Sequence, residues 1–263
     1  MRLPISVVDA FTRTRFGGNP AAVVVLSHWL APAQMQAIAA ENNLSETAFV
    51  LREPDGAFSI RWFSPTTEIA FCGHATLASA HVIAQRALAP FPIVVRAPAV
   101  GQMRIARSAD GHGFEMDFPL RRAQPVEAPP ALLAGLSIAP RQVLRNVQAW
   151  IAVYAQEREV REVMPDLERL KTLGPLDVAV TAPGDRHDFV SRYFWPANGG
   201  TEDPVTGAIH TALAPYWAER LGRSDLRALQ ASWRSGELRC RVAGERVHIA
   251  GDTVQYLDGH IEI

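Results

Sequence analysis

The sequence predicts an α+β protein made of two similar lobes, in which β-strands wrap around a central helix. Two observations carry this prediction. The chain contains two helical segments that are apolar on nearly every face, and a helix of that kind is typically buried. The residues around these two segments also repeat. The length of 263 residues suits two domains of about 100–150 residues, or one large domain.

The first half of the chain alternates strand-like runs with helices. Pro32 suits the first turn of a helix whose apolar face carries Met35, Ile38 and Ala39. The first buried helix is expected at residues 74–85, directly after Gly73. Short apolar runs bounded by turn residues predict strands at residues 4–9, 21–26, 47–52 and 58–63.

The composition changes between residues 119 and 140, where prolines accumulate. This stretch predicts a linker with one short helix, and we place the boundary between the lobes there, giving lobes of 1–118 and 119–263. The second buried helix is expected at residues 208–221, with Pro215 inside it and Gly222 just past its end. Further strands are expected in the second half at residues 147–154, 178–181 and 189–194.

A weak internal repeat links the two halves. The segment RWFSP at residues 61–65 matches RYFWP at residues 192–196, upstream of the first and second buried helix respectively. Downstream, 28 residues separate Gly73 from Gly101 in the first half. In the second half, 29 residues separate Gly207 from Gly236. Matched spacing on both sides of a buried helix indicates duplication, and it predicts two similar lobes with a cleft between them.

Composition excludes several classes of partner. The formal net charge is −1, without the basic excess that nucleic-acid binding usually requires. No run of about 18 apolar residues is present, so no membrane span is expected. The first residues do not have the layout of a signal peptide. Only two cysteines occur, which argues against a disulfide framework and favours a reducing, cytoplasmic setting.

The glycines before the buried helices suggest a binding site. The N-terminus of a helix presents unpaired N–H groups and a partial positive charge. Two such ends facing each other across a cleft would hold a carboxylate through the backbone of Gly73, His74, Gly207 and Ala208. The alternative is that both glycines only permit tight turns between a strand and a helix.

Three polar residues are candidates for acid/base chemistry. Glu46 lies between a helix and an apolar strand, and a carboxyl group pressed against apolar neighbours holds its proton more tightly than one in water. Asp203 lies four residues before Gly207, and His74 opens the first buried helix. Each has an ordinary structural alternative, as a solvated loop residue, a turn aspartate or a structural histidine. On these residues alone the structural alternative is favoured in each case.

Common catalytic and cofactor motifs are absent. The sequence has no Gly-rich dinucleotide or Walker loop, no Gly-x-Ser-x-Gly and no His-Glu-x-x-His. Cys72 and His74 have no second cysteine or histidine at metal-binding spacing. We therefore predict no nicotinamide cofactor, no nucleotide hydrolysis, no serine-hydrolase chemistry and no structural zinc.

Several motifs together resemble those of the PhzF-like phenazine-biosynthesis family. They follow one another over nearly the whole chain, and residues 116–119 and 235–238 fit as well. The motifs are DAF at residues 9–11, GNPAAV at 18–23, NLSETAF at 43–49, FCGHATLA at 71–78 and EDPVTG at 202–207.

This resemblance implies the diaminopimelate-epimerase-like fold, with two pseudo-two-fold-related lobes that are each a mixed barrel around a helix. It also implies a homodimer and an isomerase that needs no cofactor. Such an enzyme moves a proton between carbon atoms of a small, in some cases cyclic, carboxylate. Glu46 matches the glutamate that carries the proton, and His74 and Asp203 match its polar partners. The family often has serine where this chain has Ala208, which puts the substrate's identity in doubt.

Two other functions stay open at this point. Related epimerases and racemases place a cysteine before each helix glycine, but here Cys72 occupies the first position and Thr206 the second. A two-thiol racemase is therefore not expected, whereas a one-base epimerase or dehydratase of an amino or imino acid could use Cys72. The third possibility is a non-catalytic binding protein on the same fold, because a fold alone does not determine function.

Overall fold

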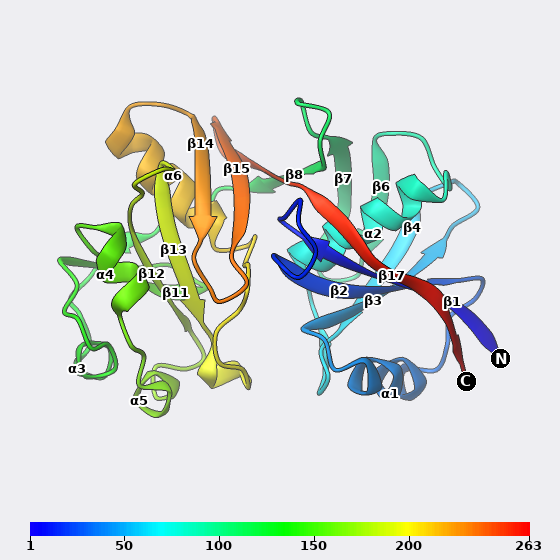
Figure 1. Cartoon of the computed structure of the whole chain (residues 1–263), viewed down its shortest axis with the longest axis horizontal. Helices are drawn as coiled ribbons and strands as arrows, with labels where there is room; N and C mark the ends of the chain where they lie inside the picture. The colour runs from blue at the N-terminus through cyan, green and yellow to red at the C-terminus, as the bar shows by residue number, and fades with distance from the viewer. The chain divides into compact units, whose positions relative to one another are not determined.

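The computed structural model describes residues 1–263, which divide into two compact units. Unit 1 comprises Met1–Asp117 and Ala250–Ile263, and unit 2 comprises Phe118–Ile249. The first boundary between the units follows Asp117, whereas the lobe boundary was expected after residue 118. The end of the chain differs from the expected lobes, because strand β17 (Thr253–Glu262) pairs antiparallel with β1 (Arg2–Ala10) and so belongs to unit 1. Figure 1 shows these two strands side by side, with both chain termini near their ends.

Unit 1 is a mixed sheet that encloses a helix. Its strands are joined in the order β1–β2 antiparallel, β2–β3 parallel, β3–β4 antiparallel, β4–β6 parallel and β6–β7 antiparallel. Besides β1 and β17, its elements are β2 (Asn19–Leu26), α1 (Pro32–Asn42), β3 (Glu46–Arg52), β4 (Phe58–Phe63), β5 (Glu68–Ile69), α2 (Gly73–Gln85), β6 (Ile93–Ala97), β7 (Gly101–Arg107) and β8 (Phe114–Pro119), the last of which ends in unit 2.

The helices of unit 1 follow the expected pattern. Pro32 stands at the first turn of α1, which buries Met35, Ile38 and Ala39 and ends at Asn43 in the left-handed conformation. Helix α2 packs against β1, β2 and β3. Its first eight residues are all buried, as a helix without a polar face requires.

Unit 2 repeats this scheme. Its strands are joined as β10–β11 antiparallel, β11–β12 parallel, β12–β13 antiparallel, β13–β14 parallel and β14–β15 antiparallel. Its elements are β9 (Gln124–Pro125), α3 (Pro130–Ala134), β10 (Gln142–Arg145), β11 (Ala149–Val153), α4 (Glu157–Glu162), α5 (Leu167–Lys171), β12 (Asp177–Pro183), β13 (Phe189–Phe194), the 3-10 helix η1 (Pro196–Asn198), α6 (His210–Leu221), β14 (Asp225–Gln230), β15 (Gly236–Ala243) and β16 (Arg246–Gly251).

The same succession of parallel and antiparallel pairs confirms the two similar lobes that the sequence predicts. The buried helices also occupy equivalent places, since α2 connects the parallel strands β4 and β6 and α6 connects the parallel strands β13 and β14. No helix is long and apolar enough to span a membrane.

The start of the second buried helix differs from the expectation. Helix α6 begins at His210 rather than at residue 208, although it ends as predicted at Gly222 in the left-handed conformation, with Pro215 inside. Residues 207–209 form a tighter turn, in which the N–H groups of His210 and Thr211 donate to carbonyl oxygens three residues earlier. Gly207 and Ala208 therefore lie in the turn that leads into the helix.

Candidate active site

Glu46 is held at the edge of the apolar interior of unit 1. It is the first residue of β3, where it lies opposite Ala21 of β2. The next four residues are buried and fix the strand, and Asn42 Nδ2 donates to Thr47 Oγ1 at 3.0 Å. Only 12% of the Glu46 side chain is exposed. The strand thus presents a carboxylate that is largely shielded from water.

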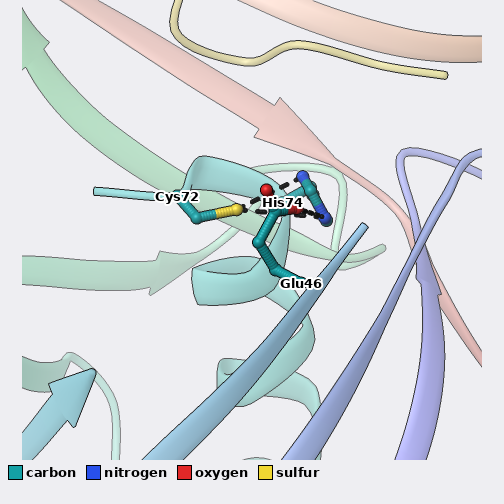
Figure 2. Close-up of side chains that lie close together, drawn as sticks. All are labelled: Glu46, Cys72 and His74. Atoms are coloured by element: carbon teal, nitrogen blue, oxygen red, sulfur yellow. Dashed lines mark hydrogen bonds and ion pairs between the residues drawn. The ribbon is translucent and has the colours of Figure 1, made fainter. Parts of the chain in front are cut away.

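His74 meets this carboxylate from the start of α2. Its side chain is 6% exposed, and its Nε2 lies 2.9 Å from Glu46 Oε2 (Figure 2). The contact is close, but Glu46 Oε2 lacks the alignment of an ordinary hydrogen bond. On its other side, His74 Nδ1 lies 3.1 Å from Asn19 Nδ2. With Asn19 as the donor, Nδ1 is the acceptor and the ring carries its proton on Nε2, the nitrogen beside Glu46.

Cys72 completes this group. It caps α2 in an extended conformation, and its side chain makes no capping hydrogen bond. Its Sγ instead lies 3.4 Å from Nδ1 and 3.9 Å from Nε2 of His74. Figure 2 shows the Cys72 thiol and the Glu46 carboxylate both directed at the His74 ring. A carboxylate, a thiol and an imidazole within 4.8 Å of one another can exchange protons with a ligand and with each other.

A second polar group surrounds Asp203 in unit 2. Thr206 donates its hydroxyl to Asp203 Oδ2, and the Asp203 N–H donates to Tyr193 O at 2.9 Å. Gln230 is fully buried and fixes this turn from β14: its Nε2 donates to Asp203 O at 2.9 Å, and its Oε1 accepts from the Thr206 N–H at 2.8 Å. The orientation of Asp203 is therefore determined by an internal network.

The turn after Thr206 presents backbone donors. The N–H groups of Gly207 and Ala208 donate to no carbonyl within the chain. In unit 1, Gly73 is the first residue of α2, so its N–H has no helical partner either. All three positions thus offer N–H groups that a bound anion could accept, although Gly207 and Ala208 do so from a turn and not from the helix itself.

His210 serves the structure of unit 2. It is fully buried at the start of α6, and its Nδ1 lies 2.9 Å from Thr206 O. Burial lowers the pKa of His210 to about 4, so the ring is neutral near pH 7 and its Nδ1–H donates to that carbonyl. The ring helps hold the turn that carries Thr206.

Two groups brought together by the fold were not singled out from the sequence. Asn19 lies 55 residues from His74 and Gln230 lies 24 residues from Thr206. Each stands at the end of a strand, where a polar residue is common, so the sequence carried no specific signal for either. Of the predicted catalytic residues, Glu46 and His74 meet in unit 1, and Asp203 lies in unit 2, in the same segment as Gly207 and Ala208.

Comparison with known proteins places the chain in a family. The sequence model described as phenazine biosynthesis-like protein matches residues 8–259. An uncharacterized isomerase from Pseudomonas aeruginosa is 46% identical over 263 residues, with 100% of both chains covered. The phenazine biosynthesis-like domain-containing protein 2 of mouse is 37% identical, with 98% of this chain and 99% of the mouse protein covered.

Solved structures agree with these relatives. The crystal structure of a PhzF-family phenazine biosynthesis protein from Enterococcus faecalis has a TM-score of 0.95 and 38% identity, and the match covers 100% of both chains. A hydroxyproline epimerase from Agrobacterium vitis, solved with trans-4-hydroxy-L-proline, has a TM-score of 0.61 at 10% identity, covering 99% of this chain and 92% of the epimerase. The second likeness establishes the shared epimerase-like fold alone. The chain therefore belongs to the PhzF-like phenazine-biosynthesis family and is an isomerase.

Proposed function

We propose that the protein moves a proton between two carbon atoms of a small carboxylate without a cofactor, and that Glu46 carries the proton. The observation that carries the proposal is the contact between a largely buried carboxylate, Glu46, and the imidazole of His74 at 2.9 Å. A general base that acts on carbon needs shielding from water and a neighbour that holds it in place.

The reaction follows from this pair. The Glu46 carboxylate takes a proton from one substrate carbon, and the electrons of the broken C–H bond shift through an adjacent double bond. The protonated Glu46 then returns a proton to a second carbon on the far side of that bond, so the substrate changes the position of its double bond and the enzyme regains its starting state. His74 Nε2–H steadies the carboxylate or a substrate oxygen while charge moves.

Other predicted residues bind the substrate in this proposal. The N–H groups of Gly73, Gly207 and Ala208 are suited to the oxygens of a carboxylate, because none of them is used by a carbonyl within the chain. Asp203, held by the Thr206 hydroxyl, assists proton movement or accepts a hydrogen bond from the substrate. The homodimer and the cytoplasmic setting are further parts of the proposal, and they rest on the family resemblance and on the composition.

Hydrogen–deuterium exchange tests the proposal without knowledge of the substrate. Small cyclic and unsaturated carboxylates are incubated with the enzyme in D₂O, and NMR follows deuterium entering their C–H positions. We expect at least one compound to exchange with the native enzyme and to lose that exchange with Glu46→Gln. Exchange that persists in Glu46→Gln would remove Glu46 from the mechanism.

A second candidate function uses Cys72 as the base of a one-base epimerase or dehydratase. The thiol lies 3.4 Å from His74 Nδ1, and an adjacent imidazole is the usual activator of a cysteine. The same assay separates the two candidates. Retained exchange in Cys72→Ser together with lost exchange in Glu46→Gln supports the first, and the opposite pattern supports the second.

A further inference from the structure

We propose that Glu46, Cys72 and His74 together form a binding site for a soft divalent cation, represented by Zn²⁺, and that the bound ion blocks the isomerase. The binding half of this inference rests on the geometry of the three side chains. The inhibitory half rests on the function proposed above, because it requires Glu46 and His74 to be free for proton transfer.

The separations of the donor atoms suit a tetrahedral ion. A Zn²⁺ ion bound tetrahedrally to sulfur, nitrogen and oxygen at ordinary bond lengths places those atoms about 3.4–3.6 Å apart. Cys72 Sγ and His74 Nε2 are 3.9 Å apart, and His74 Nε2 and Glu46 Oε2 are 2.9 Å apart. All three donor atoms lie within 4.8 Å of one another. Shifts of about half an ångström, within the reach of side-chain rotation, would bring them to bonding positions.

The charges also suit such an ion. Cys72 binds as a thiolate and releases its proton to solvent, Glu46 binds as a carboxylate and His74 binds as a neutral ring. Two negative ligands balance the two positive charges of the ion, so the loaded site is neutral, which favours a position where the side chains of His74 and Glu46 are only 6% and 12% exposed. Thiolate and imidazole ligands select zinc and similar ions over magnesium or calcium.

Asn19 orients the histidine for this role. Histidine ligands usually bond through their second ring nitrogen to a neighbouring acceptor that fixes the ring. The Asn19 side-chain amide lies 3.1 Å from His74 Nδ1, and a half-turn of the amide would present its oxygen to an Nδ1–H group. That arrangement puts the ring's lone pair on Nε2, the atom nearest Glu46, where it can bind the ion.

Unit 2 offers an internal contrast. Thr206 and Ala208 stand where unit 1 has Cys72 and His74, relative to the equivalent glycines Gly207 and Gly73. The cysteine and histidine on either side of the helix glycine thus occur in unit 1 alone, and one ion per chain is expected. Sequence spacing did not predict the site, since Glu46 lies far upstream of Cys72 and comes near it because α2 packs against β2 and β3.

Cobalt titration tests the binding half. Co²⁺ is added to untagged, chelator-treated protein, and the absorption band of a cobalt–thiolate bond is recorded, followed by displacement with Zn²⁺. We expect saturation at one equivalent, loss of the band in Cys72→Ser and weaker binding in Glu46→Gln. The metal affinity should fall by at least about 10-fold in Glu46→Gln, because removing even a group that only hydrogen-bonds to a metal ligand lowers the affinity by about 10–100-fold.

Cys240→Ser is the matched control. Cys240 is the second free cysteine, it is buried in unit 2, and burial raises its pKa to about 12, so it should bind no cobalt. We expect its band to equal that of the native protein. A band that survives Cys72→Ser, a band that disappears in Cys240→Ser, or the absence of saturable binding would each overturn the site.

The inhibitory half is tested in the deuterium-exchange assay. Zn²⁺ at one equivalent should stop exchange in the native enzyme, and a chelator should restore it. If the enzyme shows the cobalt band and still exchanges deuterium fully, the inhibitory half of the inference would be overturned, while the binding half would stand. Because the cobalt titration needs no substrate, failure of the proposed isomerase mechanism would leave its result unaffected, and the two proposals can fail separately.

Discussion

The two units hold equivalent carboxylates in different surroundings. Glu46 is the first residue of β3, and the residue after it pairs with the phenylalanine that ends β4. Asp177 is the first residue of β12, and the residue after it pairs with the phenylalanine that ends β13. Glu46 meets the ring of His74 at 2.9 Å. Asp177 instead accepts hydrogen bonds from Tyr193 Oη at 2.6 Å and Asn198 Nδ2 at 2.7 Å. The first carboxylate lies beside an imidazole, and the second is held by hydrogen bonds from a tyrosine and an asparagine.

The residues at the start of the two buried helices also differ between the units. Cys72 and His74 flank Gly73 at the start of α2, whereas Thr206 and Ala208 flank Gly207 before α6. Unit 1 therefore supplies a thiol and an imidazole at this place, and unit 2 supplies a hydroxyl and backbone donors. The comparison teaches that the two units share a framework, while the cysteine, histidine and glutamate of the candidate site lie together in unit 1 alone.

The framework itself is preserved in detail. Arg61 makes a two-pronged ion pair with Glu68, and Arg192 makes the same pair with Glu202. The Arg61 guanidinium lies 5.3 Å from the ring centre of Phe63, and that of Arg192 lies 5.0 Å from the ring centre of Phe194. Each pair ties the strand before the buried helix to the segment that leads into that helix.

The largest effect is expected from neutralising the two carboxylates in turn. Glu46→Gln should lower turnover by about 10²–10⁴-fold, because a positioned acid/base group contributes that much. Asp177→Asn is the matched control, and it should leave turnover within a few-fold of native while it weakens the bond to Tyr193. Deuterium exchange measures both. Equal losses in the two variants would break the assignment of chemistry to unit 1.

The second prediction compares the two arginines. Arg192 is 12% exposed, its partner Glu202 is 19% exposed, and its Nη1 also donates to the carbonyl of Val163 at 2.8 Å. Arg192→Ala should destabilise the protein by about 3–5 kcal/mol, since it leaves the largely buried carboxylate of Glu202 without its positively charged partner.

Arg61→Ala should cost about 1 kcal/mol or less through its ion pair, because its partner Glu68 is 42% exposed and water can replace the lost contact. Urea unfolding followed by circular dichroism measures both variants. If the two substitutions proved equally costly, burial would not be what distinguishes these ion pairs.

The third prediction concerns His210. Burial lowers the pKa of His210 from its ordinary value of 6.5 to about 4, so the folded state binds a proton less readily than the unfolded chain. The stability that this histidine provides is complete above pH 6.5 and is lost as the pH falls towards 4. The loss is about 3 kcal/mol, because each pKa unit is worth about 1.4 kcal/mol.

Unfolding free energies at pH 7 and pH 4 test this for the native protein and for His210→Gln. The variant lacks the titrating ring, so its stability should fall by about 3 kcal/mol less over this range, in line with the linkage between protonation and folding. Parallel pH profiles of the two proteins would show that His210 is not the group that titrates.

Much of the fold was predictable, because it depends on local patterns. The all-apolar faces of residues 74–85 predicted the buried helix α2, and the matched spacing around Gly73 and Gly207 predicted the repeat. The start of α6 was wrong by two residues, since the turn at residues 207–209 is as apolar as the helix itself. The pairing of β17 with β1 was missed, because a strand's own residues do not specify its partner.

The candidate site was less predictable from local patterns. Glu46 and His74 were identified through the family motifs, and the residues alone favoured structural roles for both. Asn19, Asp177 and Gln230 were not predicted at all, because their importance lies in contacts with residues far along the chain. A polar residue at the end of a strand gives only a weak indication of such contacts.

The smallest effect is expected at Ala208, the position of unit 2 where the family resemblance led us to expect a serine. The Ala208 carbonyl accepts from Thr211, while its N–H donates to no carbonyl in the chain. Ala208→Ser keeps this backbone and adds a hydroxyl in a half-buried turn, so stability should change by no more than about 0.5 kcal/mol.

If a bound carboxylate lies against this turn, one added neutral hydrogen bond is worth about 0.5–1.5 kcal/mol, which is about 2- to 12-fold in affinity. NMR titration of a carboxylate that exchanges in D₂O measures the change, and Ala208→Gly, which adds no hydroxyl, is the control. Unchanged affinity in the serine variant would place the ligand away from this turn and leave its recognition to unit 1.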